Sequence, residues 1–480
     1  MKRTSRRDFL KSAGALGVAL MPSGKFALSS RSPARKPNFV FILGDDLGYA
    51  ELGCYGQQKI KTPNIDRLAE EGIRFSQNYS GSPVCAPSRC VLLTGLHSGH
   101  AFIRDNLEVK PEGQLPLPGE TVSFAKLLKE EGYATAAVGK WGLGFPGSEG
   151  VPEKQGFDLF FGYNCQRLAH NYYPLYLWRN DRKIMLEGNT AGLTGRQYAP
   201  DLFEVEALDF IRRHKDRPFF LHFVTTVPHL ALQVPEDSLD EYKGKWDDAP
   251  YDGRNGYLPQ PYPRAAYAAM VTRLDRSVGR IVDLLGQLGL DRDTIVMVSS
   301  DNGSTFKIGG YDPDFFKGTG SFRSNKGSVY EGGVRVPLIV RWSGRIKPGK
   351  TTDHVVALQD VLPTLLDAAG AAPRIPAGID GLSFLPTLLG MGKQPGHEYL
   401  YMEFPAYGGQ QMVRLGNWKG VRQNLLKDPD APVELYDLAT DVGERNDLAQ
   451  KNPKIVEKIR QIMQDARRPS KEFPFPALDR

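Results

Sequence analysis

One cysteine of this chain stands in a segment whose residue types favour attack on an anionic ester. Pro87 of the segment Cys85-Ala-Pro-Ser-Arg89 is typical of the first turn of a helix, where a missing N–H costs nothing. Cys85 is therefore expected at or just before a helix N-terminus, where free N–H groups and the helix dipole favour an anion. Arg89 follows one turn later on the same face. A cysteine beside a guanidinium suits attack on an oxyanion ester, although a buried cysteine by itself is more often inert packing.

Acidic and amide side chains follow two apolar runs that lie far apart in the chain. Asp45-Asp46 comes after the run 38–43, and Asp301-Asn302 comes just after the run 294–299. Such runs are typical of strands buried in a parallel sheet, whose C-terminal ends share one edge. These oxygen ligands favour Ca²⁺ or Mg²⁺ over zinc. Both pairs are also common turn formers, so the pattern alone leaves a metal site and a structural turn open.

Apolar runs and helical patterns alternate over the first three quarters of the chain. The apolar runs occupy 38–43, 134–138, 219–224, 294–299 and 336–340, and the helical patterns occupy 62–72, 121–131, 201–214 and 267–288. This alternation indicates an α/β fold with a large mixed, mostly parallel sheet sandwiched by helices. Functional groups of such folds gather beyond the C-terminal ends of the strands, where the two acidic pairs are expected.

The last quarter of the chain has a different pattern. A Pro/Gly-rich connection at 371–380 is typical of a boundary between domains. Short strand-like pieces follow at 398–404, 411–414, 418–421 and 433–436, with a final helix near 453–466. We therefore expect a catalytic domain over 37–370 and a smaller C-terminal α+β subdomain over 385–480, with a short antiparallel sheet packed on a helix.

The N-terminal residues resemble a bacterial twin-arginine export signal. The segment Ser5-Arg-Arg-Asp-Phe-Leu-Lys11 precedes a short apolar stretch at 13–21, and we assign the signal peptide to residues 1–30. The stretch is too short for the roughly 20 residues of a membrane span. The resemblance implies passage through the Tat translocase and a bacterial protein in the periplasm or outside the cell. A disordered basic terminus is the alternative interpretation.

Charge and cysteine content exclude some classes of protein. Residues 1–30 carry six basic side chains and one acidic side chain, so five of the six net positive charges lie there and the remainder is near neutral, at +1. Nucleic acid is therefore not an expected partner. The four cysteines show neither a disulfide framework nor the CxxC spacing of a zinc site.

Six motifs together resemble the formylglycine-dependent sulfatases, an arylsulfatase-like family of the alkaline-phosphatase superfamily. Cys85–Arg89 with Thr94-Gly95 resembles their Cys-x-Pro-Ser-Arg signature, and Gly132–Gly142 resembles the second signature, Gly-Tyr-x-Thr-x-x-x-Gly-Lys-Trp. The other four, in the family's order, are Asp45-Asp46, Pro228-His229, Asp301-Asn302, and Lys326-Gly327 with Tyr330–Arg335. The resemblance extends from about residue 38 into the C-terminal region.

The resemblance implies a particular chemistry. A formylglycine-generating maturation enzyme would oxidise Cys85, and one hydroxyl of the hydrated aldehyde would attack sulfur and release the alcohol. The second hydroxyl would then re-form the aldehyde and expel sulfate. The implied metal ligands are Asp45, Asp46, Cys85, Asp301 and Asn302 around Ca²⁺. The implied catalytic residues are Cys85 with Arg89, Lys140, His229 and Lys326, which bind the sulfate or assist proton transfer.

One position departs from the family's pattern. Many sulfatases carry a histidine two positions after the motif lysine, where it contacts the gem-diol, but this chain has Gly142 there. His170 and His222 are the candidates for the missing proton acceptor. His170 is equally a candidate for binding a sugar hydroxyl. Both His170 and His222 are also assigned to substrate binding.

The expected function is hydrolysis of a sulfuric ester with release of inorganic sulfate. A sulfated carbohydrate is preferred as substrate over an aryl or lipid sulfate, because an exported bacterial sulfatase suggests degradation of sulfated glycans. One alternative is a phosphonate monoester or phosphodiester hydrolase of the same superfamily. The alternative from another class is a catalytically silent protein that binds sulfated glycans.

Overall fold

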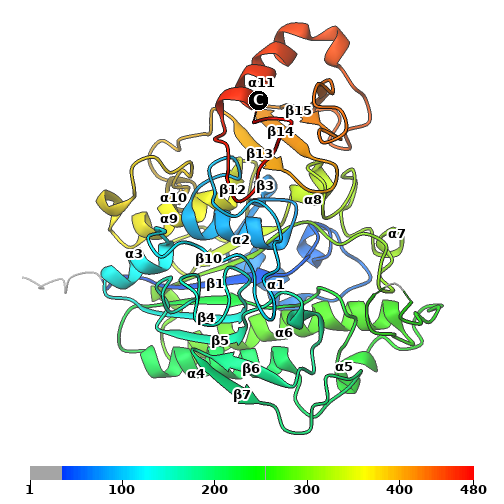
Figure 1. Ribbon diagram of the computed structural model, residues 1–480. Helices are drawn as coiled ribbons and strands as arrows, with labels where there is room; N and C mark the ends of the chain where they lie inside the picture. The colour runs from blue at the N-terminus through cyan, green and yellow to red at the C-terminus, as the bar shows by residue number, and fades with distance from the viewer. Residues whose placement is uncertain (1–34, 255, 480) are drawn as a thin grey trace, which may run out of the picture. The chain divides into compact units, whose positions relative to one another are not determined.

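A mixed sheet organises the computed structural model, which describes residues 35–254 and 256–479 (Figure 1). In the described residues the sheet has ten strands in the order β11-β2-β10-β9-β1-β8-β4-β5-β6-β7. Their bounds are β1 Asn38–Gly44, β2 Ile73–Phe75, β4 Ala134–Lys140, β5 Leu159–Tyr163, β6 Tyr176–Arg179, β7 Arg182–Met185, β8 Phe219–Val224, β9 Thr294–Ser300, β10 Leu338–Trp342 and β11 Lys350–Thr352. The expected export signal at 1–30 lies outside the described residues.

The centre of the sheet is parallel and its flanks are mostly antiparallel. β1 pairs in parallel with β8 and β9, and β4 pairs in parallel with β8 and β5. β10 runs antiparallel to both of its neighbours, although its apolar run resembles those of the parallel strands. Burial on both faces produces the same residue pattern in either direction. The predicted α/β fold with a mixed, mostly parallel sheet is confirmed.

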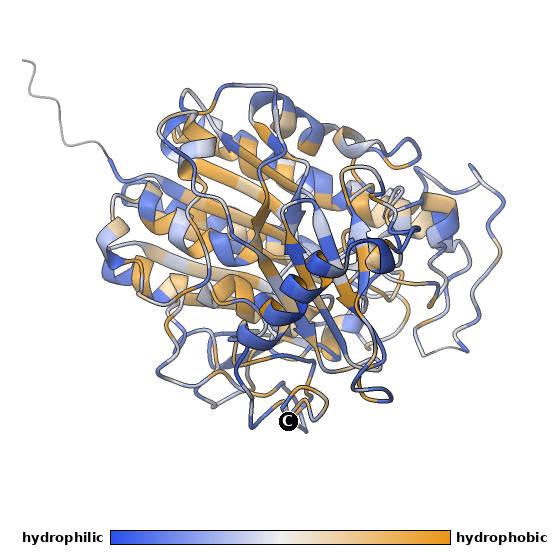
Figure 2. Ribbon diagram, turned by 90° about the horizontal axis from the view of Figure 1, so that it is seen from above, coloured by the Kyte–Doolittle hydropathy of each residue, from blue (hydrophilic) through white to orange (hydrophobic). Residues whose placement is uncertain are grey.

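Helices cover both faces of the sheet because the strand residues are apolar on both sides. Val40 and Ile42 of β1 share a core with the helices α1 (Pro63–Glu71), α4 (Ala199–His214) and α6 (Pro263–Gln287). Phe39 and Phe41 point to the other face, which packs against α2 (Cys85–Thr94), α3 (Phe124–Glu130) and α9 (Val361–Ala368). Figure 2 shows the hydrophobic strands between these layers of helices.

Short elements connect the layers. They are η1 Gly53–Tyr55, η2 Leu168–His170, α5 Glu236–Leu239, η3 Asp291–Asp293, α7 Pro313–Phe316, α8 Glu331–Val334, η4 Leu358–Asp360, η5 Ala372–Arg374, α10 Leu385–Leu389 and η6 Ala449–Lys451, with β3 Asn78–Tyr79 paired to β12 Val356–Ala357. No helix in the described part of the chain combines the length and apolar character needed to cross a membrane.

The C-terminal segment forms the predicted antiparallel sheet and helix. The strands are β13 Leu400–Phe404, β14 Gln410–Leu415, β15 Trp418–Arg422 and β16 Glu434–Asp437, and the helix is α11 Pro453–Asp465. The described residues from Lys36 onward nevertheless form one compact unit. Tyr79 and Val84 share a hydrophobic core with Leu400 and Phe404. The Pro/Gly-rich connection is also held in place, since the N–H groups of residues 380 and 381 both donate to the carbonyl oxygen of Gly95 at 3.0 Å. The boundary between 37–370 and 385–480 stays a prediction.

Candidate active site

The two acidic pairs meet because β1 and β9 are neighbours in parallel register. Gly44 lies opposite Ser300, so the residues that follow each strand emerge side by side. The backbone N–H of Asp46 donates to Oδ1 of Asp301 at 3.1 Å. Nδ2 of Asn302 donates to Oδ1 of Asp46 at 2.8 Å. The predicted convergence of the strand ends is thus present in the structure.

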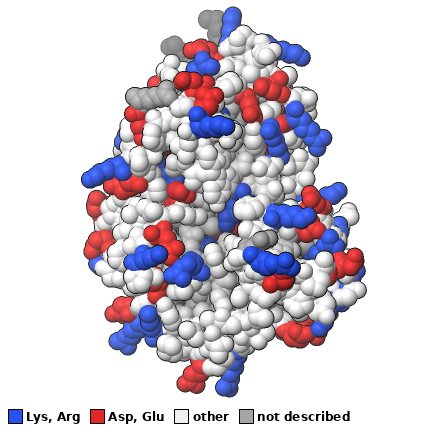
Figure 3. All heavy atoms as spheres, turned by 45° about the vertical axis from the view of Figure 1, so that its right-hand side comes forward, with Lys and Arg blue, Asp and Glu red and all other residues white. Residues whose placement is uncertain are grey.

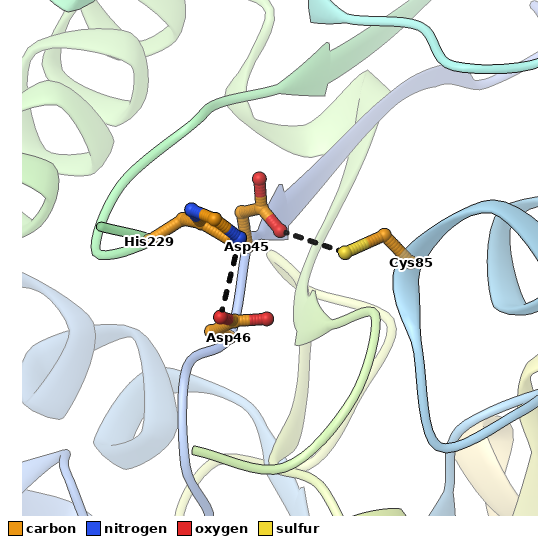
Figure 4. A group of neighbouring side chains, drawn as sticks. All are labelled: Asp45, Asp46, Cys85 and His229. Carbon is orange, nitrogen blue, oxygen red and sulfur yellow. Dashed lines mark hydrogen bonds and ion pairs between the residues drawn. The ribbon is translucent and has the colours of Figure 1, made fainter. Parts of the chain in front are cut away.

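Cys85 approaches this group from the N-terminus of α2, as its sequence context predicts. It is the first residue of the helix, and its Sγ lies 3.5 Å from Oδ1 of Asp45. Figure 4 shows Asp45, Asp46, Cys85 and His229 converging from separate segments of the chain. Burial raises the pKa of the Cys85 thiol to about 12, although Lys140 and Lys326 favour the thiolate. The unmodified thiol is therefore protonated near neutral pH and is a poor nucleophile.

Three cationic side chains surround the carboxylates and the sulfur, and two of them are lysines. Nζ of Lys140 lies 2.7 Å from Oδ2 of Asp45 and 3.7 Å from Sγ of Cys85. Nζ of Lys326 lies 2.8 Å from Oδ2 of Asp46 and 3.4 Å from the same sulfur. Both lysines converge on the sulfur, as expected for residues that bind an anionic group there. In Figure 3 basic side chains also appear in the hollow at the middle of the face shown.

Arg89, the third cation, joins the helix to the strand ends. Its Nη2 donates to Oδ2 of Asp301 at 2.8 Å, and its Nη1 donates to the carbonyl oxygen of Lys140. Burial alone would raise the pKa of Asp45, but Lys140 and the other neighbouring cations hold it well below its usual range. Burial raises the pKa of Asp301 to about 6, and the nearby Asp45 contributes to this rise. The cluster thus sets three buried carboxyl side chains against three cations that are buried or nearly so.

His229 contributes an imidazole to the same cluster. Its Nδ1 lies 2.6 Å from the carbonyl oxygen of Leu230, which assigns the proton of the neutral ring to Nδ1. Nε2 is then an acceptor, 3.6 Å from Oδ2 of Asp46. Burial and the charge of Lys326 hold the pKa of His229 well below its usual value. Because Nε2 of His229 and Oδ2 of Asp46 are both acceptors, a proton or a cation between them would satisfy both atoms.

The structure separates the two histidines that were candidates for the missing acceptor. The ring of His170 stacks on that of His229, with centroids 4.8 Å apart. His222 is not brought to the site: it lies within β8 and faces the α2 side of the sheet. Its ring packs against Phe41, Phe124, Phe157 and Phe220. Burial lowers the pKa of His222 to about 3. The expectation of a strand-end histidine fails because β8 continues two residues further and the side chain points into the core.

An amide side chain lies next to Gly142, the position at which the family's histidine is absent. Gly142 has φ +80°, and a Cβ there would lie 3.0 Å from Nε2 of Gln166. That Nε2 donates to Oδ1 of Asn106 at 3.2 Å, and Oδ1 also accepts the N–H of Ala86, next to the nucleophile, at 3.0 Å. Sequence reasoning missed Gln166 and Asn106, since both lie in loops outside the six motifs.

The residues present fit a hard divalent cation. Asp45, Asp46, Cys85 and His229 each offer a ligand atom, all within 4.8 Å of one another. Oδ1 of Asn302 is buried and has no hydrogen-bond partner among the described residues. Buried acceptors of this kind normally have a partner, and carboxylate and amide oxygens are ligands that Ca²⁺ prefers. His229 also belongs to this group, although the sequence assigned it to sulfate binding or proton transfer and not to the metal.

Comparison with known families and proteins agrees with this geometry. The sulfatase family matches residues 37–371, and the family described as N-sulphoglucosamine sulphohydrolase, C-terminal, matches residues 320–469. Human arylsulfatase A is 33% identical, over 89% of this chain and 87% of its own length. Canine N-acetylgalactosamine-6-sulfatase is also 33% identical, over 76% of this chain and 68% of its own length.

Solved structures show the same fold. A crystal structure of Ps i-CgsB in complex with k-i-k-neocarrahexaose has a TM-score of 0.77 at 27% identity, covering 90% of this chain and 94% of that one. The phosphonate monoester hydrolase of Agrobacterium radiobacter shares the fold, with a TM-score of 0.64 at 19% identity, covering 90% of this chain and 95% of that one. The motifs, the cluster that they build and the length of the matches lead to one conclusion: this chain belongs to the sulfatase family and is a sulfuric ester hydrolase.

Proposed function

We propose that the chain hydrolyses a saccharide sulfate, with Cys85 matured to formylglycine and Ca²⁺ as the metal. The observation that carries this proposal is the position of the Cys85 sulfur, 3.4 Å from Nζ of Lys326 and 3.5 Å from Oδ1 of Asp45 in a buried cluster. Two relatives support a saccharide. One is named N-acetylgalactosamine-6-sulfatase, and the other was solved with a neocarrahexaose.

The environment of Cys85 explains why an unmodified thiol would serve poorly. Its pKa of about 12 keeps it protonated, and a thiol ester of sulfate has no internal route to release the sulfate group. Formylglycine, when hydrated, supplies one hydroxyl for attack on sulfur and a second whose deprotonation expels the sulfate. The N-terminus of α2 and the two lysines then stabilise negative charge at that position.

The cations of the cluster bind the sulfate group and stabilise charge as it develops. Lys140 and Lys326 both reach the nucleophile, while Arg89 is fixed by Asp301 and orients the helix against the strand ends. A bound Ca²⁺ would supply Lewis acidity at this position. Its ligands would be Asp45, Asp46, Asp301, Asn302 and the oxidised side chain at position 85. Because the acidic and basic side chains of the cluster already balance, an added divalent charge favours binding of an anionic ester.

His229 is the residue placed to exchange a proton with the alcohol oxygen. Its Nδ1–H is fixed on the carbonyl oxygen of Leu230, so only Nε2 faces the cluster. An anionic sulfate ester beside Nε2 would raise the pKa of His229 from its depressed value and so favour the protonated ring. The protonated ring would then donate to the leaving oxygen. His170, stacked on His229, is the neighbouring candidate acceptor during sulfate release.

We also propose that residues 1–30 export the folded protein through the Tat translocase of a bacterium to the periplasm or beyond. The support is the pair Arg6-Arg7 ahead of a short apolar stretch. Expression of the full chain and of the Arg6→Lys/Arg7→Lys variant, with fractionation of the cells, tests this. Export of both forms to the same extent would contradict the assignment.

The test of function is a substrate screen with protein co-expressed with a formylglycine-generating enzyme. Mass spectrometry of the peptide that contains position 85 reports its conversion, with Cys85→Ala as the inactive variant and Cys54→Ala as the matched control. The substrates are 4-nitrophenyl sulfate, 4-nitrophenyl phosphate esters and defined sulfated mono- and disaccharides. We expect conversion, release of sulfate from a saccharide, and dependence on Ca²⁺ after treatment with EDTA. Faster turnover of phosphate esters would favour the phosphohydrolase alternative, and an unconverted, inactive protein that binds sulfated glycans would favour the silent binder.

A further inference from the structure

A cavity of about 490 Å³ opens next to the catalytic cluster. Its walls come from residues between 167 and 176, from Gly253 and 256–258, and from Ala191. Its lining includes His170, Asn171, Leu175, Tyr257 and Leu258. We call this cavity the Tyr257 pocket. None of the six sequence motifs contributes a residue to it.

Two aromatic rings join the Tyr257 pocket to the cluster. His170 lines the pocket and stacks on His229 at 4.8 Å, and the Tyr257 ring lies 5.5 Å from that of His170. The Tyr257 ring is also 6.4 Å from the ring of His229, whose Nε2 is 3.6 Å from Asp46. The pocket therefore lies one side chain away from the groups that bind the sulfate. The cavity offers space for the alcohol part of a substrate whose sulfate occupies the cluster.

The chemistry of the walls restricts what the pocket accepts. Asn171 is already engaged, since its Nδ2 donates to the carbonyl oxygen of Ala191 and its Oδ1 accepts the N–H of Tyr173. Arg167 at the rim is paired with Glu108 at 2.7 Å. The pocket thus offers an aromatic face, aliphatic side chains and one imidazole, and the charge of Arg167 is paired.

We propose that the Tyr257 pocket binds the pyranose ring that carries the sulfate, with the apolar face of the sugar on Tyr257 and a ring hydroxyl hydrogen-bonded to His170. Aromatic faces bind the C–H face of a sugar, while a few polar groups fix its orientation. The inference rests on the proposed saccharide substrate and assigns the residues that select it. Tyr257 and His170 are accordingly specificity-determining residues of the same site.

Hydrogen bonds fix the two ends of the segment that carries Tyr257. Tyr251 and Gln260 exchange two backbone hydrogen bonds of 2.9 Å across its base. Nε2 of Gln260 donates to the carbonyl oxygen of Leu232 at 2.8 Å, which ties the loop to the segment that follows His229. Fixed ends reduce the conformational freedom that this segment loses on binding, which favours the stacking contact.

Product inhibition tests the pocket separately from the sulfate site. The assay uses the matured enzyme with 4-nitrophenyl sulfate as reporter substrate. The inhibitors are inorganic sulfate and the unsulfated parent sugar of whichever saccharide the substrate screen identifies. Tyr257→Ala should raise the inhibition constant of the sugar roughly tenfold, and Tyr257→Phe should restore it, since the stacking face is retained. The inhibition constant of inorganic sulfate should change less than twofold. Tyr262→Ala, an exposed tyrosine outside the pocket, is the matched control.

The outcomes distinguish the pocket from the function on which it rests. A rise in the inhibition constant of the sugar alone, reversed in Tyr257→Phe, supports the pocket. An unchanged constant for the sugar, or equal rises for sugar and sulfate, overturns the pocket while saccharide turnover by the wild type still supports the proposed function. If the wild type hydrolyses 4-nitrophenyl sulfate but no saccharide, the saccharide substrate and the pocket assignment both fall.

Discussion

Asn302, which follows β9, contacts Asp46, which follows the neighbouring strand β1: Nδ2 of Asn302 donates to Oδ1 of Asp46 at 2.8 Å. The other atom of the amide, Oδ1, is buried without a hydrogen-bond partner among the described residues. An unsatisfied buried acceptor destabilises a fold, typically by about 1–3 kcal/mol. A metal ligand gains a partner when the ion binds, so this arrangement fits Asn302 as a ligand of the proposed metal ion.

The first prediction concerns the affinity for Ca²⁺. Asn302→Ala removes one oxygen ligand and should weaken Ca²⁺ binding roughly 10- to 100-fold, the range seen when the surroundings of a metal are altered. Calorimetric titration of the EDTA-stripped, matured protein measures it. Asn446→Ala changes an exposed asparagine and is the control. Equal affinities of Asn302→Ala and the control would remove Asn302 from the ligand set.

The second prediction concerns stability and pH at Glu51, which lies behind the Asp45-Asp46 turn. Tyr267 and Tyr311 donate to its Oε1 and the N–H of Gly48 donates to Oε2, yet burial raises its pKa from 4.5 to about 7. The folded state therefore holds a proton that the unfolded state releases between these values. The stabilisation is complete below pH 4.5 and is lost as the pH rises through 7.

Glu51→Gln should flatten this pH dependence, because glutamine does not titrate. Between about pH 4.5 and 8 the free energy of unfolding of the wild type should fall by about 3 kcal/mol more than that of the variant. Urea denaturation at saturating Ca²⁺ measures both. Glu457→Gln, on the exposed side of α11, is the control and should follow the wild type. Parallel pH curves for wild type and Glu51→Gln would show that Glu51 has the same pKa in the folded and unfolded protein, which contradicts the prediction.

The third prediction separates His170 from His222 as acceptor of a proton during sulfate release. His222→Phe should leave turnover within about twofold of the wild type, because its ring already packs in an aromatic core. His170→Ala should slow the steady state relative to the first turnover, since its ring stacks on His229 beside the cluster. Burst kinetics with 4-nitrophenyl sulfate measure the two phases. Unchanged release in His170→Ala would eliminate it as the acceptor.

The sequence was sufficient to predict the parallel centre of the sheet and the convergence of the acidic residues of the site. Two apolar runs that end in Asp45-Asp46 and Asp301-Asn302 can be placed side by side, because parallel strands share an edge for their C-terminal ends. The position of Cys85 followed from Pro87, which sets the start of a helix. These features depend on local residue patterns, and the structure retains them.

Other features depend on tertiary contacts that no local pattern encodes. The direction of β10 was not predictable, since a strand buried on both faces has the same composition either way. In the sequence His222 resembled a residue at a strand end. In the structure β8 continues to Val224, so His222 lies inside the strand and its side chain points into the core. Gln166 and Asn106 meet Gly142 and α2 only because separate loops fold together.

The fourth prediction concerns Gly142, where the family's histidine is absent. A side chain there must adopt φ +80° and would place its Cβ 3.0 Å from Nε2 of Gln166. Gly132 is the matched control, since it has φ +87° and a Cβ there would meet no other atom within 4 Å. Gly132→His should lower the free energy of unfolding only by the backbone strain, about 1–2 kcal/mol. Gly142→His should lower it further, because Gln166 must also move.

The additional loss of stability that we expect for Gly142→His, compared with Gly132→His, should disappear in a Gln166→Ala background. The free energies of unfolding of the wild type, both single variants and the double variant form a cycle that isolates the contact between positions 142 and 166. The double variant also brings an imidazole two residues beyond Lys140, whose Nζ lies 3.7 Å from Sγ of Cys85, so its sulfate release should be faster than that of Gln166→Ala alone. Equal losses at Gly132 and Gly142, or a cycle with no coupling, would mean that Gln166 does not fill the space next to position 142.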